Sequence, residues 1–144
     1  MTTVGPARRA RRTAVAAVAA VAAVALVCGC GASRERIDGA SAAASSFAEA
    51  ARAGDGAAMC AVLAPETEQE LERSERTACD DAVVEQHLPT AGPVERVDVH
   101  GRQAMAVFED DTLFLSRFSS GWKVVAAGCT PRPGRPYQCR IQSG

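Results

Sequence analysis

The residues of this 144-residue chain that are most able to do chemistry are its six cysteines. A thiol can take up a lipid, bind a metal or form a disulfide, and its surroundings decide which. A zinc site made of four cysteines needs close pairs such as Cys-x-x-Cys, and the chain has none. We therefore predict no metal and no cofactor. The six positions are Cys28, Cys30, Cys60, Cys79, Cys129 and Cys139.

The first two cysteines end a segment with the pattern of a secretory signal. Its basic start contains Arg8, Arg9, Arg11 and Arg12 but no acid, and residues 14–28 are almost wholly alanine and valine. A basic start, a short apolar centre and small residues at the end are typical of exported proteins. As a helix the run is about 22 Å long, shorter than the ~30 Å hydrocarbon core. The pattern therefore favours a cleaved signal over a membrane-spanning helix.

The end of that segment, Leu26-Val27-Cys28-Gly29-Cys30, resembles the lipobox of bacterial lipoproteins. The resemblance implies a signal peptide over residues 1–29, cleavage before Cys30, and diacylglycerol on the Cys30 thiol with palmitate-type chains. It implies a protein anchored in the cell membrane, on the extracytoplasmic face. Valine at 27, where leucine is commoner, and Cys28, where alanine or serine is usual, depart from the motif. The alternative is ordinary cleavage at Ala23-Val24-Ala25, which would leave no lipid.

Cleavage before Cys30 would change the charge of the chain. The whole sequence has 16 basic and 17 acidic residues. The signal removes four arginines and no acid, so the mature chain keeps 12 basic and 17 acidic residues, a net charge of −5. An acidic domain has no electrostatic reason to bind nucleic acid or anionic lipid. We therefore predict no nucleic-acid partner.

The four later cysteines form an even set, which in a small exported domain indicates disulfides. Four cysteines allow three pairings. We favour Cys60–Cys79 and Cys129–Cys139, because the members of each pair are close in sequence and fall in the same half of the domain. Each loop closure should contribute about 3 kcal/mol in the chain-entropy model.

The pattern of apolar residues changes near Pro89 and predicts helices first and strands second, an α+β fold. Residues 30–39 lack an apolar period and are interpreted as a lipidated tether, followed by a single domain over 40–144. The predicted helices are residues 41–53, a helix capped by Asp55 and ended by Pro65, a short piece with Thr67 and Glu70 at capping-box spacing, and residues 78–87 capped by Thr77. The predicted strands are a first one with Val94, Val97 and Val99, then 104–108, 112–118, 122–129 and 137–141. Short turns between them indicate an antiparallel meander.

This order of elements resembles the nuclear-transport-factor-2-like, or SnoaL-like, cone, in which helices pack on a curved antiparallel sheet. A sharper resemblance is to small uncharacterised lipoproteins of high-GC Gram-positive bacteria. It is carried by Gly54-Asp55, the stretch 60–65 with Thr67, Cys79, the stretches 114–118 and 121–129, and Pro131, Tyr137 and Cys139. The resemblance implies a fold and a location but no activity.

Few residues of the sequence could take part in catalysis, and we predict that none of them is catalytic. His87 at a helix end and His100 in a turn are expected to be exposed, and Asp80 and Asp81 suit the first turn of a helix. Glu109-Asp110-Asp111 offers too few oxygens at the wrong spacing for calcium.

Two aromatic residues could line a pocket. Trp122 is expected to anchor a core that is poor in aromatics, near the mouth of the cone, with ligand stacking as the alternative. Tyr137 is expected to pack beside the second disulfide.

Two functions from different classes remain. The first is a non-enzymatic accessory module that binds another envelope protein or a small apolar ligand. The second is a cone-fold enzyme, an isomerase or hydrolase, acting on a small organic substrate. An enzyme should have a buried carboxylate or histidine within reach of a donor in a cavity. An accessory module should instead have a collapsed or purely apolar cone, or an exposed apolar patch.

Overall fold

The computed structural model of the chain describes residue 1 and residues 33–143. Cys30 and the predicted signal lie outside the described residues. The chain divides into two units, Met1–Glu35 and Arg36–Gly144. The second unit is an α+β domain with two disulfides, as predicted. In the described part, no helix is both long and apolar enough to cross a membrane.

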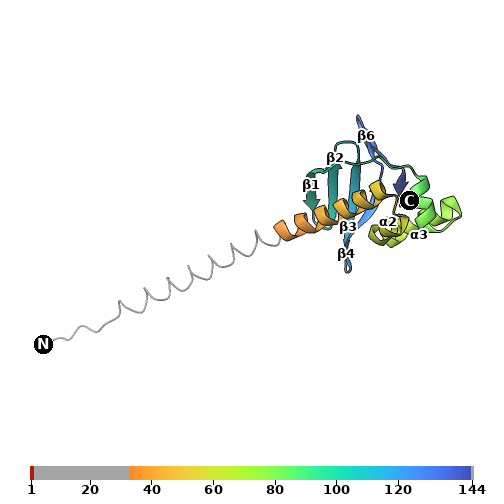
Figure 1. Cartoon of the computed structure of the whole chain (residues 1–144). Coiled ribbons are helices and arrows are strands. Elements are labelled where there is room, and N and C mark those ends of the chain that lie inside the picture. Colours follow the sequence, from red (N-terminus) through yellow and green to blue (C-terminus); the bar gives the residue numbers. More distant parts are fainter. Residues whose placement is uncertain (2–32, 144) are drawn as a thin grey trace. The chain divides into compact units, whose positions relative to one another are not determined.

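Within the described residues, four helices precede the strands. The first covers residues 33–53 in the described part, so it is helical well before the predicted start at Ser41. It is followed by α2 (Gly56–Val62), α3 (Pro65–Glu75) and α4 (Cys79–Glu85). In the second unit, this first helix lies across one face of the sheet (Figure 1).

Two of the predicted helix caps were wrong and one is confirmed. Asp55 caps α2, and its carboxylate accepts a hydrogen bond from the Ala58 N–H at 3.0 Å. Pro65 starts α3 as well as ending the preceding turn, since proline fits the first helical position. Thr67 therefore lies inside α3 rather than at its cap. Thr77 does not cap α4, where Ala78 precedes the first residue.

The five-stranded sheet is antiparallel, with the order β1-β2-β3-β4-β7. Its strands are β1 (Val94–His100), β2 (Gln103–Phe108), β3 (Thr112–Phe118), β4 (Gly121–Ala127) and β7 (Ile141–Gln142). The sheet does not close on itself in the described residues. The first four strands are the predicted meander.

The predicted fifth strand, 137–141, was wrong as a single element. It is divided between β6 (Arg135–Gln138) and β7, with Cys139 and Arg140 between them. β6 pairs with β5 (Thr130–Arg132) in a separate two-stranded hairpin. The Cys129–Cys139 disulfide closes the base of this hairpin. The proline-rich stretch thus forms a hairpin outside the main sheet, where its missing N–H groups break no central ladder.

The core lies between the helices and one face of the sheet. Phe47 from the first helix belongs to one buried cluster with Val83, Leu113, Leu115 and Val124, all of them almost fully buried. The small residues of the first helix let it approach the sheet closely. A Cβ on Gly39 would lie 3.0 Å from the Trp122 ring, which is 8 % exposed.

The helices behind this core are held together by the Cys60–Cys79 disulfide, which joins α2 to α4. The two helices approach so closely that a Cβ on Gly56 would lie 1.9 Å from the Asp80 carbonyl oxygen. Glycine is therefore required at this contact. Both disulfides are the pairs predicted from the sequence.

Candidate functional site

The second face of the sheet, which no helix of the described residues covers (Figure 1), contains a cavity of about 290 Å³. Asp98, Met105 and Phe114 lie directly opposite one another on β1, β2 and β3, so their side chains share this face. Met105 and Phe114 form an apolar floor, and both are half-buried. The remaining lining residues are His100, Gln103 and Ala104. We call this hollow the open-face cavity.

The rim of the open-face cavity is polar on the β1 side. His100 and Gln103 lie opposite each other beside the β1–β2 turn, and both are exposed. Asp98 forms an ion pair with Arg96 at 2.9 Å. The arrangement of an apolar floor with a few polar groups at one side is typical of sites that bind small apolar molecules.

The other side of the apolar floor is in contact with Tyr137. The rings of Phe114 and Tyr137 meet edge to face, with centroids 5.1 Å apart and planes at 77°. Tyr137 comes from β6, in the hairpin closed by the second disulfide. The sequence suggested that Tyr137 packs near this disulfide, but it did not identify Phe114 as its partner. The hairpin thus brings an aromatic side chain against the open face.

Asp111 was considered from the sequence only as part of an acidic turn, and its burial was not predicted. It is 7 % exposed and is the last residue of the loop between β2 and β3. Its Oδ1 accepts hydrogen bonds from the N–H groups of Thr112 at 2.6 Å and Cys129 at 2.9 Å, and its Oδ2 accepts one from Gly128 at 3.3 Å. One carboxylate therefore ties the start of β3 to the end of β4.

The pKa of Asp111 is shifted by two opposing effects. Burial raises the pKa above its usual value, and this effect is the larger. The three N–H donors and the positive charge of Arg140 act in the opposite direction. Asp111 also contributes to a second hollow of about 490 Å³, together with Glu109, Asp110 and Tyr137. The enzyme criterion of a buried carboxylate in a cavity is thus met in part.

The hollow that contains Asp111 is not lined by a histidine that could act together with its carboxylate. His87 and His100 line other cavities, and Asp111 already accepts hydrogen bonds on both oxygens. The geometry in this region indicates a structural clamp between two strands.

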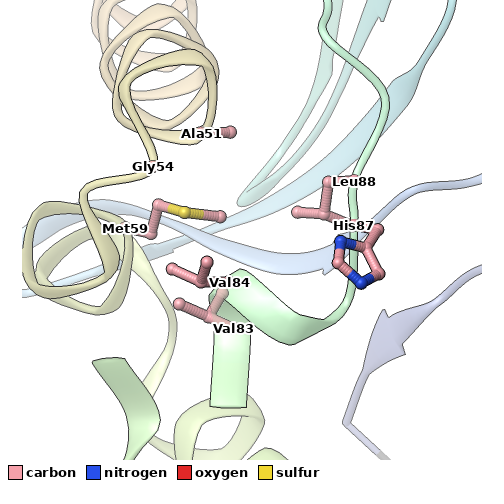
Figure 2. A pocket seen from close by; sticks show the side chains of 7 residues that line it. All are labelled: Ala51, Gly54, Met59, Val83, Val84, His87 and Leu88. Carbon is pink, nitrogen blue, oxygen red and sulfur yellow. The ribbon is translucent and has the colours of Figure 1, made fainter. Parts of the chain in front are cut away.

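The helices contain a third hollow, of about 250 Å³ (Figure 2). Figure 2 shows Met59, Val83 and Val84 from α2 and α4 on one side and His87 and Leu88 on the other. His87 is the one lining residue with a polar side chain, and Val84 is 42 % exposed. The Arg140 guanidinium donates to the carbonyl oxygens of Gln86 and His87, at 3.0 and 2.6 Å, and so holds the chain beyond α4.

The acids that the sequence placed in a helix end are found there. Asp80 and Asp81 lie in the first turn of α4, and with Asp55 and Glu85 they line an open hollow of about 560 Å³. Among the described residues, no group of three or more His, Cys, Asp or Glu side chains is arranged to hold a metal ion.

Comparison with protein-family models, curated proteins and solved structures finds no match for this chain. Its function must therefore be inferred from its own residues and geometry.

Proposed function

We propose that this protein is a lipid-anchored lipoprotein of the extracytoplasmic membrane face that acts as a non-enzymatic binding module. The lipobox-like segment before Cys30 supports the anchor. The open-face cavity supports the binding role, and it is the single observation on which that role rests. A half-buried floor of Met105 and Phe114 with a polar rim fits a small apolar ligand or an apolar side chain of another envelope protein.

We further propose that the main sheet is curved into a cone-like shape. The support is two β-bulges, one between Val94 and Arg96 in β1 and one at Val125 in β4, opposite the step from Phe114 to Leu115. Bulges increase local twist and bend a strand, which is how an open sheet becomes strongly curved. Curvature of this kind would make the open face concave.

The anchor is tested by mass spectrometry of the protein purified from membranes. We expect an N-terminus at Cys30 with a diacylglycerol modification, and loss of membrane retention in the Cys30→Ser variant. An unmodified N-terminus at Leu26 would show ordinary cleavage and refute the anchor.

The binding role is tested with a photo-crosslinking amino acid placed at Met105 of the full-length protein in intact cells. The matched control carries the same amino acid at Glu75, an exposed position at the end of α3. We expect adducts from position 105, fewer adducts when Phe114→Asp is added, and few from position 75. Equal yields from both positions, or no effect of Phe114→Asp, would contradict a binding role for the open face.

The buried Asp111 favours a second candidate function, an isomerase- or hydrolase-type enzyme acting on a small organic substrate. In that case Asp111 would act as an acid or base in the hollow beside Tyr137. We rank this second because the three N–H donors occupy both carboxylate oxygens. Substrate turnover that is lost in Asp111→Asn, in a protein that keeps its fold, would reverse the ranking.

A further inference from the structure

The two edges of the main sheet differ in whether other segments of the chain form hydrogen bonds with them. Beyond β4, the strand β7 pairs with Ala126 and Ala127. Further along the same edge, the Ala64 N–H donates to the Val124 carbonyl oxygen at 2.8 Å, and the Thr67 hydroxyl donates to that of Val125 at 3.1 Å. The β4 edge is therefore occupied for most of its length.

At the opposite edge, β1 is the outermost strand (Figure 1). In the described part of the chain, its backbone has β2 as its one hydrogen-bonding neighbour. A seven-residue edge strand with unpaired N–H and C=O groups is a template for pairing with another strand. We propose that β1 pairs antiparallel with β1 of a second copy of this chain, so that one sheet continues across two molecules.

The hydrogen-bond alternation shows which backbone groups of β1 point outward. The Arg117 N–H donates to the Arg102 carbonyl oxygen at 2.8 Å, which makes this opposed pair a hydrogen-bonded one. Hydrogen-bonded and non-hydrogen-bonded pairs alternate along antiparallel strands. On β2, Ala104 therefore directs its N–H and C=O groups toward β3, and Met105 directs its groups toward β1.

Met105 lies opposite Asp98, so the backbone groups of Asp98 face inward, toward β2. Those of the flanking residues Val97 and Val99 must then face outward, away from β2. Val97 is also the central residue of β1, which begins at Val94 and ends at His100. A two-fold axis at Val97 would let two copies exchange N–H···O=C bonds between their Val97 residues and pair along the strand.

The charges on β1 favour the same register. With the axis at Val97, Arg96 of each copy lies directly opposite Asp98 of the other. These would be non-hydrogen-bonded pairs, in which side chains approach most closely. Arg96 and Asp98 already form an ion pair within one chain, on the open face of the sheet. Two copies would therefore place four charges of alternating sign around the axis.

Neighbouring registers are less favourable. An axis at Arg96 or Asp98 would oppose two like charges in a non-hydrogen-bonded pair, where side chains approach most closely. An axis at Val99 would leave half of the strand unpaired. Charges and bulges on an edge strand also discourage indiscriminate pairing. In β1 the bulge lies at the N-terminal end, between Val94 and Arg96, and the pattern of charges is complementary to itself.

The test uses two epitope-tagged copies of the full-length chain expressed in the same membrane, and measures how much of one tag is recovered with the other. Arg96→Asp in both copies, or Asp98→Arg in both, would oppose like charges. We expect each to lower recovery about tenfold or more relative to the wild type. A mixture of one Arg96→Asp copy with one Asp98→Arg copy restores both opposite-charge pairs, so we expect recovery to return.

The matched control is Arg73→Asp, a charge reversal at an exposed position on α3 outside the proposed interface, which should leave recovery unchanged. Formation of both disulfides, seen by non-reducing peptide mapping, verifies that each variant has folded. Rescue by the mixed charges separates pairing from misfolding, because two misfolded copies would not regain association. Absence of wild-type co-recovery, or equal recovery for all variants, would overturn the proposal, as would a different protein bound at β1.

Discussion

The two faces of the sheet differ in how they are covered, and β3 shows the difference within two consecutive residues. Leu115 points into the core and is 0 % exposed, whereas Phe114 points to the open face and is half-buried. The helices pack against the first face, and the β5–β6 hairpin contributes Tyr137 to the second. Burial on the covered face therefore contributes most of the free energy of unfolding. The open face keeps exposed apolar surface that a ligand or partner could contact.

The largest expected effect tests this difference directly. Leu115→Ala should lower the free energy of unfolding by about 2–5 kcal/mol, because it leaves a cavity in a packed core. Phe114→Ala should cost about 1 kcal/mol, because less of its area is buried and the neighbouring side chains can adjust. Urea denaturation of both variants gives the comparison. Equal losses would show that the open face is packed as tightly as the core.

One disulfide lies in the helical layer and the other closes the β5–β6 hairpin. Removing either one should give the next largest loss in the free energy of unfolding. Replacing Cys60 and Cys79 by alanine should cost about 3 kcal/mol, since it frees a loop in the helical layer. Replacing Cys129 and Cys139 should cost about 0.5 kcal/mol less, because the closed loop is shorter.

The second pair of substitutions should also have a local effect that the first does not. Amide hydrogen exchange should become faster in β5 and β6 when Cys129 and Cys139 are replaced, with little change in α2 and α4. Unchanged exchange in the hairpin would mean that the Phe114–Tyr137 contact is sufficient to hold it.

The smallest expected effect is a dependence on pH at the junction of the two faces. Burial raises the pKa of Asp111, so the folded state keeps its proton to a higher pH than the unfolded state does. The free energy of unfolding should therefore fall as pH rises through the window between the ordinary and the raised pKa. Asp111→Asn cannot ionise and should flatten this dependence in urea titrations that run upward from about pH 4.

An Asp111→Ala variant tests how much the hydrogen bonds accepted by Asp111 contribute to stability, apart from its ionisation. Because three N–H groups lose their acceptor, we expect it to cost about 1–3 kcal/mol at neutral pH. Identical pH profiles for the wild type and Asp111→Asn would contradict the raised pKa.

The strands and helices were largely predictable because they depend on residues close in sequence. The alternation around Val97 and Val99 and the cap at Asp55 are local signals, and both lie where expected. The early start of the first helix was missed because residues 33–38 carry no apolar period. These residues belong to the same continuous helix as the packed segment, whose buried contacts begin near Gly39 and Ala40.

Much less of the candidate site was predictable. Met105 and Phe114 are 9 residues apart, and only the register of β2 and β3 makes them neighbours. Tyr137 was noticed because it is the one tyrosine, but its contact with Phe114 depends on a hairpin that leaves the main sheet. Pro65 shows the same limit on a smaller scale, since a proline can end one helix and begin the next.

By itself, the sequence determined that helices precede strands, favoured the disulfide pairs that the structure contains, and revealed a signal-like segment before Cys30. These follow from periodicity, composition and spacing along the chain. Only the tertiary structure decided that Asp111 is buried, that Phe114 faces an open cavity, and that the outward groups of β1 have no described partner. The physical reason is that burial and pairing depend on segments that are distant in sequence and meet only when the chain folds.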